Sequence, residues 1–227
     1  MLTLYADTDQ GEVALVRWST TIGGWKSELD AEGNVGLRYK ESPAGPRIWR
    51  DVIASPAWLP PPPTPDDDLI RNGRPDYGLF GPGYRSAYGL TMVMHHKVIP
   101  TDDEPRFADE GIRAHGSVSY RSILRGTSHG CHRLYNHLAV RLSSFLVDHR
   151  NHVRHGAIPA NFARTMVHEG EEMSFRIRSR GYRFELTPPV EVEVLEGRIR
   201  GPVSRPPQGF RRLREELVAD ALAATAD

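Results

Sequence analysis

The chain contains one cysteine, Cys131, and it lies among side chains that can change the ionisation of a thiol. His129 and His132 flank it closely, Arg133 follows, and His115 lies sixteen residues upstream. Only the thiolate is a competent nucleophile, and an ordinary cysteine is mostly protonated at neutral pH, so catalysis needs a base or a cation beside it. Two strands joined by a turn could fold His115 back onto Cys131. The cluster therefore suggests nucleophilic acyl transfer.

Gly130 immediately precedes Cys131. Glycine adopts backbone conformations closed to other residues and lets a substrate approach the main chain, where amide N–H groups can stabilise an oxyanion. Spacing alone leaves two other interpretations open. Cys131 could be a structural thiol, or His129, Cys131, His132 and His137 could bind zinc, although they lack the paired spacing of familiar zinc sites.

The exact strings narrow these alternatives. His115-Gly116-Ser117, followed by Ser128-His129-Gly130-Cys131-His132-Arg133-Leu134, resembles the signature of the L,D-transpeptidase (YkuD-type) family. That signature is His-Gly-Ser/Thr, a short spacer, then Ser-His-Gly-Cys-hydrophobic-Arg/Asn-Leu. Pro56-Ala57-Trp58-Leu59-Pro60-Pro61 resembles a second element of the family, Pro-x-Trp-x-Pro-Pro. The resemblance covers roughly residues 48–150. His132 departs from it, because the family usually has an apolar residue there.

The resemblance implies a mainly β, β-sandwich-like catalytic domain with a few short helices, one directly after the cysteine loop. It implies roles for nine residues. Cys131 is the nucleophile, His115 the base and acid, and Gly116 supplies the carbonyl that orients the imidazole. Gly130 shapes the oxyanion site. The residues expected to shape the loop or contact substrate are Ser117, Ser128, His129, His132 and Arg133, and for Arg133 its donor fork suits either fixing the loop or meeting a carboxylate.

The reaction implied is attack of the Cys131 thiol on the L,D peptide bond of a peptidoglycan tetrapeptide stem. D-alanine leaves, a thioester forms, and an amine of a second stem resolves it to give a 3-3 cross-link. The same thioester could be resolved by water, giving an L,D-carboxypeptidase, or could attach a protein to the wall. A wall-binding module with an inert cysteine is the non-enzymatic alternative. We expect no cofactor and no metal, and expect carbapenem β-lactams to acylate the thiol.

The overall composition limits the classes of partner that the chain is expected to bind. Lys plus Arg and Asp plus Glu are 29 each, so net charge predicts no nucleic-acid partner. The sequence contains no apolar run of about 18 residues, the length that a membrane-spanning helix needs, so it predicts no membrane span. The N-terminus shows no signal peptide, whereas the family resemblance implies a periplasmic or cell-envelope location, so an upstream export segment or a trimmed chain would have to reconcile the two. Abundant glycine and proline favour short strands and turns.

Several elements must position this chemistry. The apolar run 90–96 predicts a buried strand, and the acidic segment 101–110 predicts an exposed loop, with a lid over the substrate groove as the alternative. Leu138, Leu142, Phe145 and Leu146 mark one face of a helix behind the cysteine, with Asn136 as its N-cap. Residues 174–177 and 182–186 predict a hairpin around Arg180-Gly181. We expect a catalytic domain over 1–200 and a Pro-rich linker with a C-terminal helix or tail over 201–227.

Overall fold

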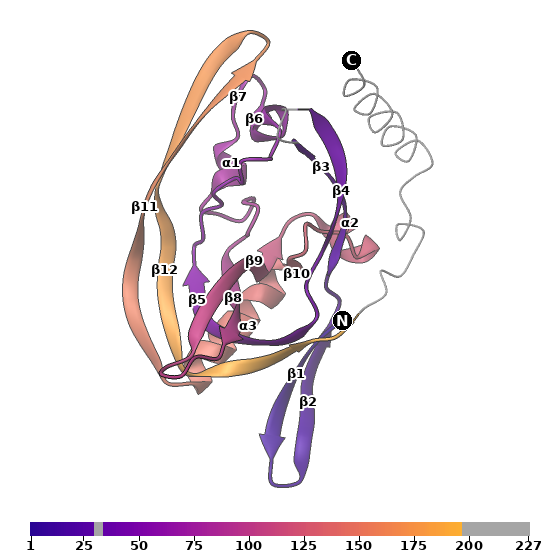
Figure 1. The fold of residues 1–227 in the computed structure, drawn as a ribbon, viewed down its shortest axis with the longest axis vertical. Helices are drawn as coiled ribbons and strands as arrows, with labels where there is room; N and C mark the ends of the chain where they lie inside the picture. Colours follow the sequence, from indigo (N-terminus) through magenta and orange to yellow (C-terminus); the bar gives the residue numbers. More distant parts are fainter. Residues whose placement is uncertain (30–33, 197–227) are drawn as a thin grey trace.

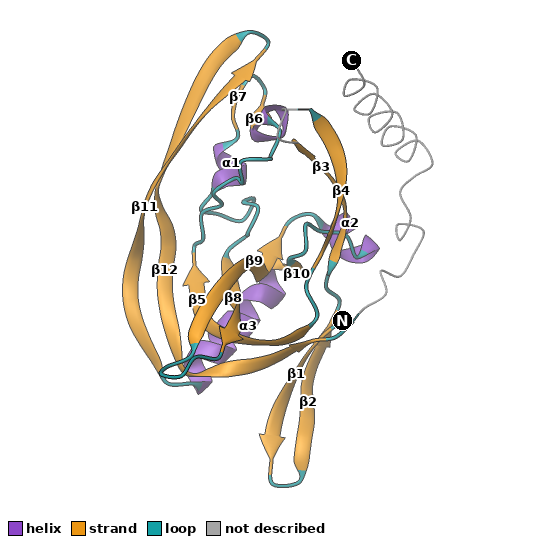
Figure 2. Ribbon diagram, in the orientation of Figure 1, coloured by secondary structure: helices purple, strands orange, loops and turns teal. Residues whose placement is uncertain are grey.

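The computed structural model describes residues 1–29 and 34–196 of the chain. The linker and helix or tail expected over 201–227 lie outside the described residues. The described part is mainly β, as expected, and its helices are few and short (Figure 2). Within it, no helix has the length and apolar character needed to cross a bilayer.

A six-stranded mixed sheet organises the molecule (Figure 1). Its strand order is β10-β9-β8-β5-β12-β11, and only the β10–β9 pair is parallel. The two strands at one end are long and form a curved hairpin along one side of the molecule. The strands are β5 (Gly45–Ala54), β8 (Thr91–Ile99), β9 (Arg106–Ser117), β10 (His132–Tyr135), β11 (His152–His168) and β12 (Glu171–Val194).

Three two-stranded sheets surround the large one. The hairpin of β1 (Leu2–Thr8) and β2 (Gly11–Trp18) projects away from the body, and the hairpin of β3 (Gly23–Leu29) and β4 (Val35–Glu41) lies opposite the long β11–β12 hairpin (Figure 1). The small elements are β6 (Ile70–Arg71), β7 (Arg74–Pro75), η1 (Asp66–Leu69), α1 (Tyr77–Phe80), α2 (Tyr120–Arg125) and α3 (Asn136–His149).

The main core lies between the large sheet and α3. The strand predicted over 90–96 is confirmed as β8, in which consecutive residues Met92 and Val93 are both buried. A strand covered on both faces needs apolar residues in succession rather than in alternation. Val93, Ala114 and Leu134 from three neighbouring strands pack in one cluster with Leu142 and Leu146 of α3. This packing fixes the position of the β9–β10 edge.

A second core holds the segment between β5 and β8 against the distal half of the β11–β12 hairpin. Phe80 of α1 stacks on Phe175 of β12 at 3.8 Å between ring centroids, and Leu69 and Met166 are fully buried beside them. Between β5 and β6 this segment contains the 3₁₀ helix η1 and no strand.

The loop expected over 101–110 is wrong in its second half. β9 begins at Arg106, and two of the acidic residues are paired rather than simply solvated. Both oxygens of Asp109 accept hydrogen bonds from Arg113, at 2.6 and 2.7 Å, and Glu110 pairs with Arg47 at 2.9 Å. Arg113 lies four residues further along the same strand, whereas Arg47 is distant in sequence, and the acidic composition of 101–110 indicated neither pairing. The sequence therefore did not reveal the extended strand.

The hairpin expected around Arg180-Gly181 is also wrong. Residues 171–194 form one continuous strand, β12, and the chain reverses instead between β11 and β12. Gly181 has φ of +110° and lies so close to the backbone of Ala54 and Ser55 that a Cβ would overlap it. Gly181 is therefore not a turn residue. It marks a place inside a strand where another backbone segment approaches closely.

The helix expected after the cysteine loop is confirmed as α3, with two differences. The residue before its first turn is Tyr135, and the Asn136 side chain does not cap the helix: it donates to Tyr84 O at 3.0 Å and accepts from Leu90 N at 3.1 Å. Phe145 is 38% exposed, whereas Ala139, Leu142 and Leu146 are buried. The buried stripe is thus narrower than the spacing of apolar residues indicated.

These positions give a matched stability test. Leu142→Ala removes a side chain that is buried in the main core, so we expect unfolding to become easier by about 2–5 kcal/mol. Phe145→Ala, one turn away on the exposed side of the same helix, should cost less than about 1 kcal/mol. Urea unfolding of both variants measures the two effects, and an equal loss would contradict the packing described for α3.

Candidate active site

Strands β9 and β10 bring the two sequence strings together. The two strands pair in parallel, with Arg133 opposite His115 and Leu134 opposite Gly116. The expected turn between two strands is wrong: α2 lies between them and makes the crossover that a parallel pair requires. Because side chains alternate along strands, His115 and Arg133 share one face, and Cys131, two residues before Arg133, belongs to that face. Leu134 faces α3 on the other side.

The Cys131 thiol is partly buried beside the backbone of β9. Its Sγ donates to Gly111 O at 3.6 Å. Burial raises the pKa of the thiol, and hydrogen bonding by the Arg113 backbone together with the charges of Arg113 and Arg133 works in the opposite direction. The group is therefore a neutral thiol at rest at pH 7. Among the described residues no hydrogen bond joins it to His115, so the two side chains of the expected pair share a face without a hydrogen bond between them.

His115 is held in one tautomer. Its ring is 2% exposed, and Nδ1 is 2.7 Å from Gly116 O, which can only accept, so Nδ1 carries the proton and Nε2 keeps its lone pair. Burial, followed by the charge of Arg133, lowers the pKa of His115 to about 3. The imidazole is thus neutral over the physiological range. The carbonyl of Gly116 makes the contact expected of it.

Tyr88 is a site residue that the sequence did not indicate. Its ring meets the His115 ring edge to face at 5.0 Å between centroids. Burial raises the pKa of Tyr88 to about 12, and the nearby Cys131 thiol acts in the same direction. The phenol is therefore neutral and able to donate a hydrogen bond. Tyr88 lies between β7 and β8 in sequence and matches neither string, so only the fold brings it here.

Three glycines allow the loops to close around this face. A Cβ on Gly89 or on Gly116 would overlap the Asn136 side chain, so both must lack one. Gly130 has φ of +105°, in the region that favours glycine, and a Cβ there would lie 3.1 Å from Ile112 Cδ1. The Gly130 N–H donates to Ser128 Oγ at 3.2 Å. That donor is occupied in the resting structure, so Gly130 contributes by conformation rather than as a free oxyanion donor.

The two serines of the strings support the backbone. Ser128 and Ser117 are both buried. The Ser128 hydroxyl accepts a hydrogen bond from Gly130 N, and the Ser117 hydroxyl accepts one from Ser119 N at 3.1 Å. Arg133 donates through Nη1 to Ser122 Oγ of α2 at 3.0 Å, which favours loop fixation over an exposed contact. His129 is exposed, near Lys26 and Lys40 of the β3–β4 hairpin. Of these residues, His129 is the one open to solvent.

His132 lies on the face opposite Cys131. It is 7% exposed, its Nε2 is 3.0 Å from Ser42 Oγ, and its ring meets His95 at 4.6 Å. The position that is apolar in the resembled signature is therefore a core position here too, filled by a histidine with its own polar partner. Substrate contact through this side chain does not fit its burial. His137, on α3, stacks instead on Tyr135, and no group of three or more His, Cys, Asp or Glu among the described residues is arranged to hold a metal.

His132 makes stability depend on pH. Burial lowers the pKa of His132 to about 4 and that of His95 well below its ordinary value. The unfolded chain then binds more protons between about pH 4 and 6.5, so stability is full above pH 6.5 and falls as pH drops toward 4. His132 alone should account for a loss on the order of 3 kcal/mol. Thermal unfolding from pH 7.5 to 4 should show a shallower decline for His132→Leu than for the wild type.

Residues 20–24 bind the cysteine loop from the N-terminal side. Thr21 Oγ1 donates to Cys131 O at 2.6 Å and accepts from Arg133 N at 2.9 Å. Ser128 N donates to Gly23 O at 2.8 Å. From there the β3–β4 hairpin reaches the loop between β5 and η1, where Leu29 N donates to Pro63 O at 2.8 Å. Nothing in the local sequence of 20–24 marked this contact, which pairs residues about 110 positions apart.

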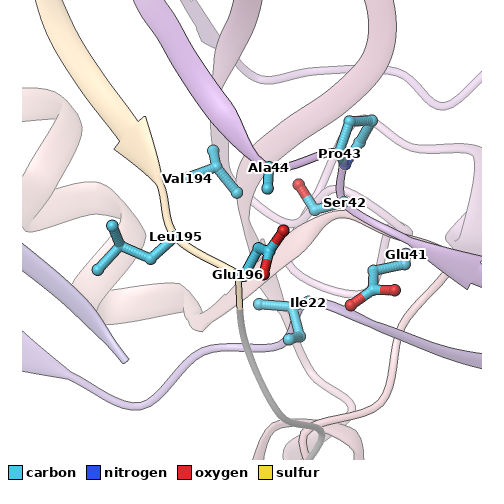
Figure 3. A pocket seen from close by; sticks show the side chains of 8 residues that line it. All are labelled: Ile22, Glu41, Ser42, Pro43, Ala44, Val194, Leu195 and Glu196. Carbon is cyan, nitrogen blue, oxygen red and sulfur yellow. The ribbon is translucent and has the colours of Figure 1, made fainter.

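A hollow of about 400 Å³ lies behind the cysteine loop (Figure 3). Ser42, the partner of His132, is one of the residues that line it. Cys131 and His115 are absent from its wall. Its lining residues are Ile22, Glu41, Ser42, Pro43, Ala44, Val194, Leu195 and Glu196.

Comparison of the chain with protein-family models, with curated proteins and with solved structures finds no match. Any assignment of function therefore depends on the residues and the geometry of this chain.

Proposed function

We propose that the chain is a cysteine-dependent acyltransferase acting on peptidoglycan, an L,D-transpeptidase with the β-sandwich-like catalytic fold of that family. One observation carries the proposal. The parallel register of β9 and β10 pairs Arg133 with His115 and Leu134 with Gly116, so the His-Gly-Ser string lies beside the end of the string that contains Cys131. Two strings that resemble one signature and are also neighbours in space are more specific than either alone.

The resting groups suit general base catalysis rather than a preformed ion pair. Cys131 is a neutral thiol and His115 a neutral imidazole whose Nε2 can accept a proton. For reaction the thiol turns from Gly111 O toward this nitrogen. The S–H proton passes to Nε2 as sulfur attacks the carbonyl of the stem. The C–N bond then breaks, the leaving D-alanine amine takes the proton, and a thioester remains on Cys131.

The second half of the reaction returns the acyl group. An amine of a second stem attacks the thioester, His115 accepts its proton, and the thiol is restored, giving the 3-3 cross-link. The low pKa of His115 helps here, because the imidazolium formed from it is a strong acid and gives its proton readily to the departing Cys131 thiolate. The substrate places the reaction in the periplasm or cell envelope. Water in place of the amine would give L,D-carboxypeptidase activity.

Product analysis tests the proposal directly. The protein is incubated with peptidoglycan rich in tetrapeptide stems, and digested products are weighed by mass spectrometry. Transpeptidation predicts 3-3 linked dimers together with released D-alanine. Tripeptides without dimers would replace the proposal with the carboxypeptidase, and an unchanged muropeptide profile with an active positive-control enzyme would reject both.

A further inference from the structure

Exposed aromatic side chains gather where β9 and β10 end. Tyr84 and Tyr120 are 50% and 42% exposed, and their hydroxyls are hydrogen-bonded at 2.7 Å. The Tyr120 ring meets Tyr135 edge to face at 4.9 Å, and Tyr135 stacks on His137 with 11° between the ring planes. We call these four residues the tyrosine platform. Single exposed aromatics are ordinary, but four rings from three separate segments, each in contact with the next, form a preorganised surface.

The platform continues the face that carries Cys131. Tyr135 follows Arg133 and Cys131 at two-residue spacing, so its side chain lies on their side of the strand, opposite Ser117 in register. Tyr135 is four positions after Cys131, which corresponds to about 13 Å of extended chain. Asn136 fixes the two regions to each other, because it holds Tyr84 O while packing against Gly116, whose carbonyl binds His115.

The chemistry of the platform suits a sugar. Tyrosine offers a flat apolar face and a hydroxyl at one rim, as a pyranose offers axial C–H groups and equatorial hydroxyls. The bond to Tyr84 raises the pKa of Tyr120, so its phenol stays neutral. An uncharged stacking surface selects by shape and hydrogen bonding rather than by charge.

We propose that the tyrosine platform binds the glycan strand of peptidoglycan and thereby aligns the attached stem with Cys131. The inference rests on the proposed function, because the stem peptide of that substrate connects the glycan to the carbonyl that Cys131 attacks. The scissile carbonyl belongs to the third stem residue, and three residues span about 10 Å at full extension. The linkage between stem and sugar covers the remaining distance to the platform.

Direct binding tests the platform without any turnover. Wild-type protein is titrated with the N-acetylglucosamine tetramer, followed by calorimetry. Tyr84→Ala and Tyr120→Ala should each weaken affinity at least tenfold, whereas Tyr84→Phe, which keeps the ring, should change it by less than threefold. Tyr5→Ala is the matched control, since Tyr5 is 52% exposed on the β1–β2 hairpin and touches no part of the platform. No binding by wild type, or an equal loss in the Tyr5 variant, would overturn the proposal.

Kinetics separate this inference from the proposed function. Tyr120→Ala should raise KM at least fivefold for stems attached to glycan and leave kcat/KM for the free tetrapeptide unchanged. Sugar binding without acyl transfer would reject the proposed function and leave the platform as a sugar site. Acyl transfer with no sugar binding would reject the platform alone. Tighter binding of a single-stranded oligonucleotide than of the tetramer would assign the aromatic surface to nucleic acid instead.

Discussion

Cys131→Ala should reduce both cross-linking and carbapenem acylation to below about one thousandth of the wild-type rate. The thiol supplies the bond that carries the acyl group, and no other cysteine is present in the chain to replace it. The fold should survive, because the side chain makes one hydrogen bond, to Gly111 O at 3.6 Å, and the loop is held through its backbone by the Thr21 side-chain hydroxyl. Circular dichroism and the melting temperature should therefore stay near wild type.

Intact-mass measurement gives the sharpest readout. Wild-type protein incubated with a carbapenem should gain one inhibitor mass, and Cys131→Ala should gain none. Cys131→Ser provides the matched control, since it keeps the size and the hydrogen bond while a hydroxyl is far less ionised than a thiol. An adduct on the alanine variant would place the nucleophile elsewhere, and an unmodified wild type would count against the site.

His115→Gln should lower the acylation rate about 10²- to 10⁴-fold, the range that a positioned general base contributes. The amide can still donate toward Gly116 O, so the variant tests proton transfer more than packing. Stopped-flow measurement of carbapenem acylation gives the rate. A variant that reacts as fast as wild type would remove His115 from the mechanism and leave the Arg113 backbone hydrogen bond and the Arg113 and Arg133 charges to favour the thiolate.

The pH profile of wild-type acylation adds a second check on His115. Its pKa of about 3 keeps the imidazole neutral from pH 5 upward, so the base form is fully present throughout. The pKa of the thiol is raised, so the neutral thiol and the neutral imidazole that react together are both present from pH 5 to 8, and the acylation rate should be nearly constant over this range. A rate that climbs with the thiolate fraction up to pH 9 would show attack by a thiolate formed without His115, and a rise that ends near pH 6.5 in wild type and is lost in His115→Gln would show a histidine with an ordinary pKa.

Local patterns predicted the elements better than their connections. The strand containing Met92 and Val93 and the helix around Leu142 follow from runs and spacings of apolar residues, which burial against a sheet or helix requires. The continuous strand through Gly181 and the strand beginning at Arg106 were missed. In both, a distant partner decides the conformation: the backbone of Ala54 beside Gly181, and the pairing partner β8 beside Arg106.

By itself, the sequence determined which residues carry the proposed chemistry, since a lone thiol in Ser-His-Gly-Cys after His-Gly-Ser depends only on residue types and order. Tertiary structure decided what surrounds them. Register and strand alternation set Cys131 and His115 on one face and His132 on the other, and contacts over long sequence separations brought Thr21 and Tyr88 to the site. Burial then set the ionisation of the thiol and the imidazole, because desolvation depends on the packed neighbours and not on the motif.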